Sequence, residues 1–506
     1  MSDPRSATAT PASRTSLQLR NVRMGSGGPL GTVSVVGGRI AAITPDVPPG
    51  PVDDVLDGQG RTLLPGLSDA HVHIVQWASA RRRIDVSTAA SAHEAAQQVA
   101  RSAAAAPAAG SAGEPLVGFG FRDGLWPDRP HRDLLDWAGE RVVALVSNDL
   151  HTAWLGAAAL AKLGRAHHPT GVLREQEALD AVARLAQVED AVADGWVADA
   201  LRAAAARGVT HLIDFEYGDN VRDWTRRLTG PQPAVRITCA IYPEHLEEAI
   251  AAGLRTGDPL PGSAGLARVG PLKLFVDGSL NTRTALCNAP YPGVPDETQA
   301  WGILQTPPHE LERVMARAAA HGVHSAVHAI GDRAGTIALD AFERVGCPGR
   351  IEHAQLIDAA DLPRFARPDL ILGVQPAHAP DDRDVADHHW AGRTHRAYAY
   401  ADLLTAGAVL QIGSDAPVSP LDPWRGIAAA VHRGGGADRE PWHPEQAIAL
   451  SDALTAAAGG RSALRVGDPA DLVLTDHDPV DLAAHELAHM PVHATMLGGR
   501  WTFRAT

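Results

Sequence analysis

The chain alternates short apolar segments with longer stretches of helical periodicity. Eight segments resemble buried strands: GLSDAHVH, GVTHLIDFE, AVRITCAIYP, VGPLKLFVDG, GVHSAVHAIG, GRIEHAQ, DLILGVQPAH and AVLQIGSDAP. Between several of them lie Ala-, Leu-, Arg- and Glu-rich stretches such as PHELERVMARAAAHG, which close with Gly before the next strand. Repeated strand and helix units indicate a parallel sheet, and eight units predict an α/β fold closed as a (β/α)8 TIM barrel.

One connection is far longer than a strand and helix unit needs. The interval from His71 to Leu212 is several times the interval from His328 to His353, so we predict an inserted subdomain at about residues 79–196. We assign its aromatic residues to its own core, with a substrate-facing role for one or two of them as the alternative. These residues are Phe119, Phe121, Trp126, Trp137 and Trp154.

The two ends of the chain resemble a separate β domain. Residues 16–64 and 464–506 contain alternating segments such as TVSVVGGRIAAITP and HATMLGGRWTFRAT, which we expect to pair into one β-sandwich. Residues 65–463 then form the barrel with its insertion. Residues 1–15 are small and polar with no apolar stretch, so we expect a disordered tail rather than a secretion signal or a membrane anchor.

The composition is ordinary for a soluble globular enzyme, with 45% hydrophobic and 21% charged residues. A net charge of -14 without a Lys/Arg block argues against nucleic acid or an anionic membrane as the partner and favours a small-molecule substrate. The three cysteines, Cys239, Cys287 and Cys347, are well separated, which argues against a disulfide framework and fits a reducing cytoplasm. The sequence leaves a homodimer open.

Imidazole and carboxylate side chains gather at the carboxyl ends of the predicted strands. His71 and His73 follow the apolar run LLPGL and project from one face of a strand, so both can reach one metal ion. Alone, this pair is equally compatible with a structural role. His328, His353 and Asp415 each end a strand of their own, where barrel enzymes place their active sites. Individually they could be hydrogen-bonded histidines and a helix cap, but together they predict a metal site.

Lysine is rare in this chain, because Lys162 and Lys273 are the only lysines among 45 basic residues. Lys162 lies near a predicted helix end, where a solvated amine is a sufficient explanation. Lys273 lies within the apolar segment VGPLKLFVDG, where an unpaired ammonium is costly and tends to lose its proton or find a special partner. The alternative is a salt bridge to an acid such as Asp277.

Seven strings together resemble the amidohydrolase superfamily of metal-dependent hydrolases: LPGLSDAHVH, GPLKLFVDGSLNTRTA, HAIGDRA, RIEHAQ, VQPAH, GSDAPV and GDPADLVL. More narrowly, the sequence is similar to amidohydrolase family 3, the group of the YtcJ-like proteins and N-substituted formamide deformylase. The resemblance covers nearly everything after the tail. It implies a binuclear metal centre in which carboxylated Lys273 bridges two divalent ions. The remaining ligands would be His71, His73, His328, His353 and Asp415.

Nitrogen and oxygen ligands without a thiolate suit zinc best, while manganese, iron and cobalt remain open. Our mechanistic hypothesis is that a hydroxide bridging two zinc ions attacks a substrate carbonyl, and that Asp415 passes the water's proton to the departing nitrogen. The expected activity is hydrolysis of a non-peptide C–N bond of the amide or formamide type in a small molecule. The alternatives are a deaminase or cyclic-amide hydrolase on the same fold, and a catalytically silent metal-binding regulatory protein.

Three further residues are candidates for substrate binding. Arg333 follows the fifth strand in HAIGDRA, His378 follows the seventh strand, and His151 lies in SNDLHTAWLG of the insertion. Arg333 could instead pair with the aspartate before it, and the two histidines could be ordinary surface residues. The insertion string resembles the family's Asp-Gly-His-Ser-x-Trp-x-Asn pattern but has Leu150 for the Gly and Gly156 for the Asn. These departures put the substrate contacts in doubt.

Overall fold

The computed structural model describes residues 16–45, 52–105, 115–121, 123, 126–147, 152–174, 176–185, 188–280, 283–293, 300–434 and 439–505. Residues 1–15, where a tail is expected, and His151 lie outside the described residues. The chain divides into two compact units. The first comprises residues 1–74 with 201–506, and the second is Val75–Ala200, a range that includes the insertion expected at about 79–196.

Eight parallel strands form the barrel of the first unit. In chain order they are β6 (Leu67–Val72), β12 (Val209–Asp214), β13 (Arg236–Ile241), β14 (Ala267–Phe275), β15 (Ser325–Ala329), β16 (Gly349–His353), β17 (Leu370–Val374) and β18 (Val409–Ile412). A parallel bridge between Val72 and Ala416 brings the last strand beside the first and nearly closes the ring. All eight predicted strand segments and the α/β barrel are therefore confirmed.

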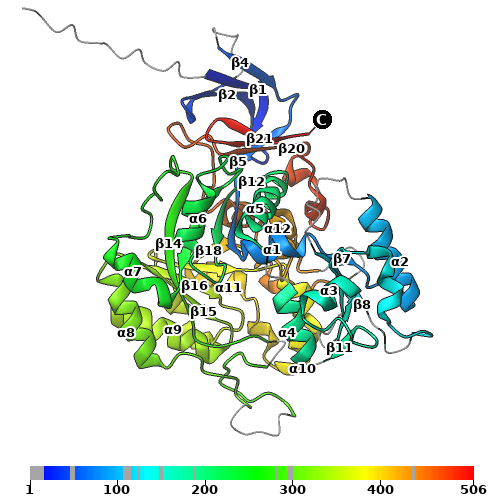
Figure 1. Cartoon of the computed structure of the whole chain (residues 1–506). Coiled ribbons are helices and arrows are strands. Elements are labelled where there is room, and N and C mark those ends of the chain that lie inside the picture. Colours follow the sequence, from blue (N-terminus) through cyan, green and yellow to red (C-terminus); the bar gives the residue numbers. More distant parts are fainter. Residues whose placement is uncertain are drawn as a thin grey trace, which may run out of the picture. The chain divides into compact units, whose positions relative to one another are not determined.

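Helices follow most barrel strands and bury one apolar face. In α8 (Pro308–Ala319), Leu311, Met315 and Ala318 recur at helical spacing and are buried. Figure 1 shows α8 and α9 beside strands β15 and β16. The contacts agree, because α8 contacts β15 and α9 contacts both strands. The other helices of this unit are α6 (Asn220–Arg227), α7 (Leu246–Ala251), α9 (Asp332–Val345), α10 (His378–His389), α11 (Tyr400–Ala406), α12 (Pro423–His432) and α13 (Leu450–Ala457).

Short 3-10 turns complete the connections of the first unit. They are η3 (Pro243–His245), η4 (Ala359–Phe365), η5 (Thr394–Arg396), η6 (Pro444–Gln446), η7 (Pro479–Asp481) and η8 (Glu486–His489). Among the described residues of the whole chain, no helix combines the length and the apolar character that crossing a bilayer requires.

Strands from both chain ends form one mixed sheet, whose blue and red strands lie together in Figure 1. They are β1 (Ser16–Met24), β2 (Leu30–Val36), β3 (Arg39–Thr44), β4 (Asp54–Asp57), β5 (Thr62–Pro65), β19 (Leu472–Thr475), β20 (Val492–Leu497) and β21 (Arg500–Arg504). The antiparallel pair β5 and β19 joins the two ends. The sheet forks at β1, which pairs with β4 along its first half and with β5 along its second. Leu19 of β1 and Met496 of β20 share the resulting core.

The second unit is built on a five-stranded sheet in the order β11-β10-β9-β8-β7. Its strands are β7 (Ile84–Asp85), β8 (Leu116–Phe121), β9 (Val143–Ser147), β10 (Thr152–Leu155) and β11 (Val172–Arg174). Its helices are α2 (Ala92–Ala105), η2 (Arg132–Ala138), α3 (Ala157–Lys162) and α4 (Gln176–Leu185), while α1 (Ile74–Ala80) and α5 (Asp190–Ala205) stand at its borders.

The aromatic residues of this unit do not all behave as predicted. Phe121 and Trp154 are fully buried and Trp126 packs against their cluster, as expected of core residues. Phe119 is half-buried, with a guanidinium 5.3 Å from its ring centre. The prediction of a core position is wrong for Trp137, because 41% of its surface is exposed. It stands two residues after buried Leu135 in the 3-10 helix η2, and two positions in such a helix turn a side chain to the far side.

Candidate metal centre

Three of the predicted ligands converge at the carboxyl ends of β6 and β18. His71, His73 and Asp415 each offer one ligand atom, and these atoms lie within 4.8 Å of one another. Asp415 Oδ1 is 3.3 Å from His73 Nε2 and 3.6 Å from His71 Nε2. The hydrogen bond from the Asp415 backbone N–H to the His71 carbonyl, 2.8 Å long, holds the two strand ends together. The convergence is therefore a consequence of barrel closure.

His328 and His353 lie next to this group. The ring centres of His353 and His71 are 5.1 Å apart, and those of His328 and His353 are 4.4 Å apart. His328 Nε2 lies 3.1 Å from the Gly278 carbonyl oxygen. Because a carbonyl only accepts, the ring carries its proton on Nε2, which leaves Nδ1 as the nitrogen that can bind a metal. The structure thus brings all four predicted imidazoles around one rim of the barrel.

Two of these residues have an unusual backbone. His353 has φ 77° and Asp415 has φ 56°, both in the left-handed region that non-glycine residues rarely adopt. Such conformations cost of the order of 1–3 kcal/mol each and cluster at functional sites. At these positions they follow the strand ends and aim both side chains at the shared rim.

Lys273 lies on β14 with its side chain wholly buried. Its Nζ has no hydrogen-bond partner among the described residues. The Nζ atom instead faces aromatic rings, 4.6 Å from the centre of Phe215 and 5.1 Å from that of Phe275. Burial lowers the pKa of the Lys273 amine to about 8, so a substantial fraction of the amine is neutral near physiological pH.

The alternative partner considered for Lys273 is occupied elsewhere. The Asp277 carboxylate is buried and accepts hydrogen bonds from three backbone N–H groups, at distances of 2.8, 3.0 and 2.8 Å, from Leu286, Ile330 and Gly331. Its Oδ1 also lies 3.5 Å from His328 Nε2. No ion pair between Lys273 and Asp277 occurs among the described residues, so a salt bridge does not explain the buried lysine.

Two charged residues behind the rim were missed in the sequence. Glu352 Oε2 lies 2.8 Å from His71 Nδ1, and Arg350 Nε donates to Glu352 Oε1 over 2.7 Å. Both side chains are buried. Although burial acts against the charge, Arg350 and then His71 hold the pKa of Glu352 well below its usual range. The signal was present in the string RIEH, where two opposite charges stand two positions apart on one face of a buried strand.

The titration behaviour of the rim suits metal binding. Burial, followed by the charge of Lys273, lowers the pKa of His71 to about 4 and that of His328 to about 3. Burial opposes ionisation of Asp415, but His71 and His73 outweigh it and lower the pKa of its carboxyl far below normal. At neutral pH His71 and His328 are therefore neutral imidazoles and Asp415 is a carboxylate, the protonation states that bind a divalent cation.

Asp69 projects from the same face as His71 and His73, but its carboxylate is bound to backbone N–H groups. Its Oδ1 accepts hydrogen bonds from the backbone N–H groups of Ser414, at 2.8 Å, and His71, at 3.2 Å. It thereby ties β6 to the segment after β18. Burial, only partly offset by Ser414, raises the pKa of the Asp69 carboxyl to about 7.

The candidate substrate residues have different surroundings. His378, the first residue of α10, is buried, and its Nε2 has no hydrogen-bond partner among the described residues. His378 is among the groups that lower the pKa of Asp415, so it lies near the rim. Arg333 is exposed, and its guanidinium forms no ion pair within the described part of the chain, although its backbone N–H donates to Asp332. His151 lies outside the described residues.

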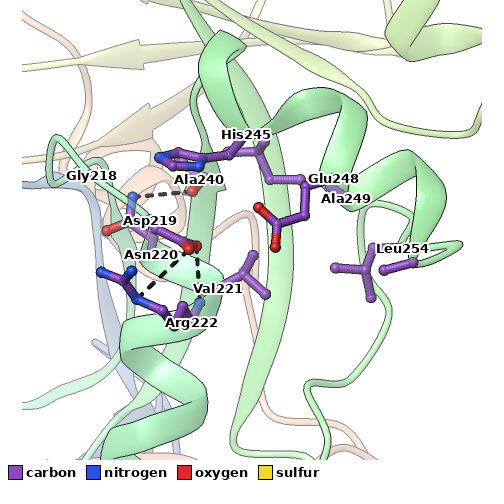
Figure 2. Close-up of a pocket in the computed structure, with 12 residues that line it drawn as sticks. Gly218, Asp219, Asn220, Val221, Arg222, Ala240, His245, Glu248, Ala249 and Leu254 are labelled. Carbon is purple, nitrogen blue, oxygen red and sulfur yellow. Dashed lines mark hydrogen bonds and ion pairs between the residues drawn. The ribbon is translucent and has the colours of Figure 1, made fainter.

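A second group of metal-type ligands lines a pocket of about 180 Å³ beside α6 and α7. Figure 2 shows Asp219, His245 and Glu248 there, with ligand atoms within 4.8 Å of one another. This group is partly or fully exposed, and Asp219 already accepts the Arg222 backbone N–H at 3.1 Å as the cap of α6. Exposed groups of this kind are common without an ion, so the buried rim is the better candidate.

Comparison with known proteins agrees with the geometry. A sequence profile described as "Amidohydrolase family" matches residues 54–503. The chain belongs to this amidohydrolase family. A putative amidohydrolase, YtcJ of Bacillus subtilis (strain 168), is 24% identical to it over 89% of this chain and 90% of the relative. N-substituted formamide deformylase of Arthrobacter pascens is 25% identical over 94% and 95%. These matches confirm the family resemblance.

A solved structure also matches this member of the amidohydrolase family. The crystal structure of an uncharacterised metal-dependent hydrolase from Pyrococcus horikoshii OT3 superimposes with a TM-score of 0.76 at 25% identity. The match covers 93% of this chain and 99% of that structure.

Proposed function

We propose that this amidohydrolase is a metal-dependent hydrolase that cleaves a non-peptide C–N bond, of the amide or formamide type, in a small molecule. The observation that carries the proposal is Lys273, a buried lysine whose Nζ lacks a hydrogen-bond partner among the described residues and lies against the rings of Phe215 and Phe275. The related formamide deformylase motivates the bond type.

The residues present fit a pair of divalent ions. His73 Nδ1 is a second buried polar atom without a partner among the described residues, as a site awaiting a ligand would show. The proposed ligands are His71, His73, His328, His353, Asp415 and carboxylated Lys273. Nitrogen and oxygen donors without a thiolate favour zinc. Bound at these residues, zinc would supply an acidified water at neutral pH and a Lewis acid for a carbonyl oxygen.

The chain's own residues prepare Lys273 for carboxylation. The uncharged Nζ attacks carbon dioxide, forms an N–C bond and releases one proton, so the product is a carbamate anion. The pKa of about 8 keeps enough amine neutral for this step. An arginine at this position stays protonated and cannot undergo it.

We assign the proton transfer of the proposed reaction to Asp415. Its Oδ1 faces His73 Nε2 at 3.3 Å, and its lowered pKa keeps it anionic and able to accept. In the proposal, Oδ1 holds the proton lost by the attacking water and delivers it to the departing nitrogen. His378 Nε2 orients the substrate beside Asp415, and Arg333 and His151 are the further proposed substrate contacts.

The test compares the only two lysines of the chain. Lys273→Arg keeps the bulk and charge but cannot form a carbamate, so we expect loss of activity on a panel of N-substituted amides and formamides and a lower metal content. Carbon-13 NMR with labelled bicarbonate should show a carbamate resonance in the wild type and none in Lys273→Arg. Lys162→Arg is the matched control, because Lys162 is exposed at the end of α3 and should change none of these readouts.

Three outcomes would overturn parts of the proposal. Two metals per chain with wild-type turnover in Lys273→Arg would exclude the bridging role. One metal per chain with ammonia released from an amine substrate would indicate a deaminase instead. A metal-loaded chain inactive on the whole panel would indicate a regulatory protein.

A further inference from the structure

A large cavity lies at the amino-terminal ends of the barrel strands, opposite the rim of candidate metal ligands. It has a volume of about 770 Å³. Its walls come from the first residues of β12, β13 and β14 and from the turns of the terminal sheet, all within the first unit. In TIM barrels this end serves stability rather than catalysis, so the cavity is separate from the proposed reaction.

The lining of this cavity is strongly cationic. Five of its residues are arginines and one is an acid: Arg39, Arg236, Arg268, Arg461, Arg500 and Asp471. This concentration of positive charge stands in a chain whose net charge is -14. A cationic hollow on an acidic protein raises the local concentration of anions.

The single acid compensates only one of the five guanidinium groups. Arg236 binds Asp471 through two hydrogen bonds, of 2.6 and 3.0 Å. Asp471 Oδ1 also accepts the Gly498 backbone N–H at 2.7 Å. The charges of Asp471 and Asp468 also act on Arg461, but neither acid forms an ion pair with it among the described residues, and Asp468 does not line the cavity. The described residues therefore leave the other four guanidinium groups without a carboxylate ion pair.

Three of these four groups are oriented by backbone carbonyls. Arg461 donates to the Gly66 carbonyl at 2.5 Å, Arg39 to that of Gly467 at 2.7 Å, and Arg500 to that of Pro233 at 2.9 Å. A carbonyl aligns a guanidinium without neutralising its charge, so the positive potential is preserved.

The fourth guanidinium, that of Arg268, and the imidazole of His211 also line the cavity. Arg268, the second residue of strand β14, is exposed and donates no side-chain hydrogen bond among the described residues. His211 Nε2 lies within hydrogen-bond distance of Thr238 Oγ1, at 2.9 Å. Burial, followed by the charge of Arg461, lowers the pKa of His211 to about 4, which agrees with a positive field in the cavity.

We propose that this cavity binds a small organic polyanion carrying two or more phosphate or carboxylate groups. Guanidinium groups recognise both kinds of anion through paired hydrogen bonds. The volume lies within the range of about 300–1,000 Å³ typical of sites for organic ligands and far exceeds the need of a single inorganic ion. The ligand would link Arg268 of the barrel to Arg39 and Arg500 of the terminal sheet.

The test measures binding of inorganic pyrophosphate and of citrate to the full chain by calorimetry, at low and at physiological salt. We expect saturable binding that weakens with salt, and the preferred probe distinguishes a phosphate ligand from a carboxylate ligand. The double variant Arg268→Gln with Arg500→Gln should bind at least tenfold more weakly, because it removes two of the charged hydrogen-bond donors that would hold the anion.

Arg313→Gln on α8 is the matched control, because Arg313 is equally exposed but lies outside the cavity. Probe molecules that bind at a metal centre would bind the double variant and the wild type alike. The readout is therefore the difference in probe affinity between the wild type and the double variant. The proposal is wrong if neither probe binds saturably at about 10 mM in low salt, if the double variant binds like the wild type, or if only an oligonucleotide binds. None of these results depends on amide hydrolysis.

Discussion

The substitution Glu352→Gln tests how the barrel orients its first metal ligand. Glu352 Oε2 lies 2.8 Å from His71 Nδ1, which fixes the ring proton on Nδ1 and leaves Nε2 free toward Asp415. A glutamine amide can donate to Nδ1 instead. The ring proton then moves to Nε2, where it blocks metal binding, and the neutral amide no longer compensates Arg350.

Glu352→Gln should lower both the metal affinity and the free energy of unfolding. Loss of a carboxylate behind a metal-binding histidine costs about 10- to 100-fold in metal affinity, or roughly 1.4–2.8 kcal/mol. Breaking a buried ion pair costs about 3–5 kcal/mol of stability. Because the glutamine oxygen can still accept the hydrogen bond from Arg350 Nε, we expect a loss near the lower limit, about 3 kcal/mol.

The assay separates the two effects. Competition with a chelating dye measures the affinity of the folded chain for zinc, and urea unfolding of the metal-free chain measures the free energy of unfolding. The control is Glu310→Gln, because Glu310 is exposed in the first turn of α8. A folded Glu352→Gln variant whose zinc affinity stays within about twofold of the wild type, less than the tenfold minimum expected, would refute the positioning role.

Three further predictions use the same unfolding measurement. Gly413→Ala should destabilise the chain by about 2 kcal/mol and lower its metal content, because the added Cβ would lie 2.6 Å from the His71 backbone nitrogen. Asp69→Asn should gain stability relative to the wild type by about 3 kcal/mol between pH 4 and pH 7. The sign follows because the folded pKa of Asp69 is raised from 3.8 to about 7, so its contribution is present at low pH and is lost as pH rises. Trp224→Phe removes the 2.7 Å hydrogen bond to buried Asp214, whose pKa is raised to about 6. Its destabilisation, about 2 kcal/mol, should be larger at pH 8 than at pH 5, because the ionised carboxylate depends most on that donor.

The sequence alone determined the secondary structure of the barrel and the chemistry of its rim. Apolar runs of strand length, most of them followed by a helix with a buried face, are local signals, and all eight strands lie at the predicted positions. The position of His328, His353 and Asp415 at strand ends was also readable, because parallel strands of a barrel share one carboxyl end. The single buried lysine was conspicuous because arginine fills almost every other basic position.

Only the tertiary structure decided which residues meet across the barrel. His71 and Glu352 are 281 positions apart, and Asp69 and Ser414 are 345 apart, yet each pair is in hydrogen-bond contact. The arginines of the basal cavity are likewise scattered from Arg39 to Arg500. Periodicity along the chain reports the direction of a side chain relative to its own strand. The partner it meets depends on closure of the ring and on the pairing of the chain ends, which no local pattern encodes.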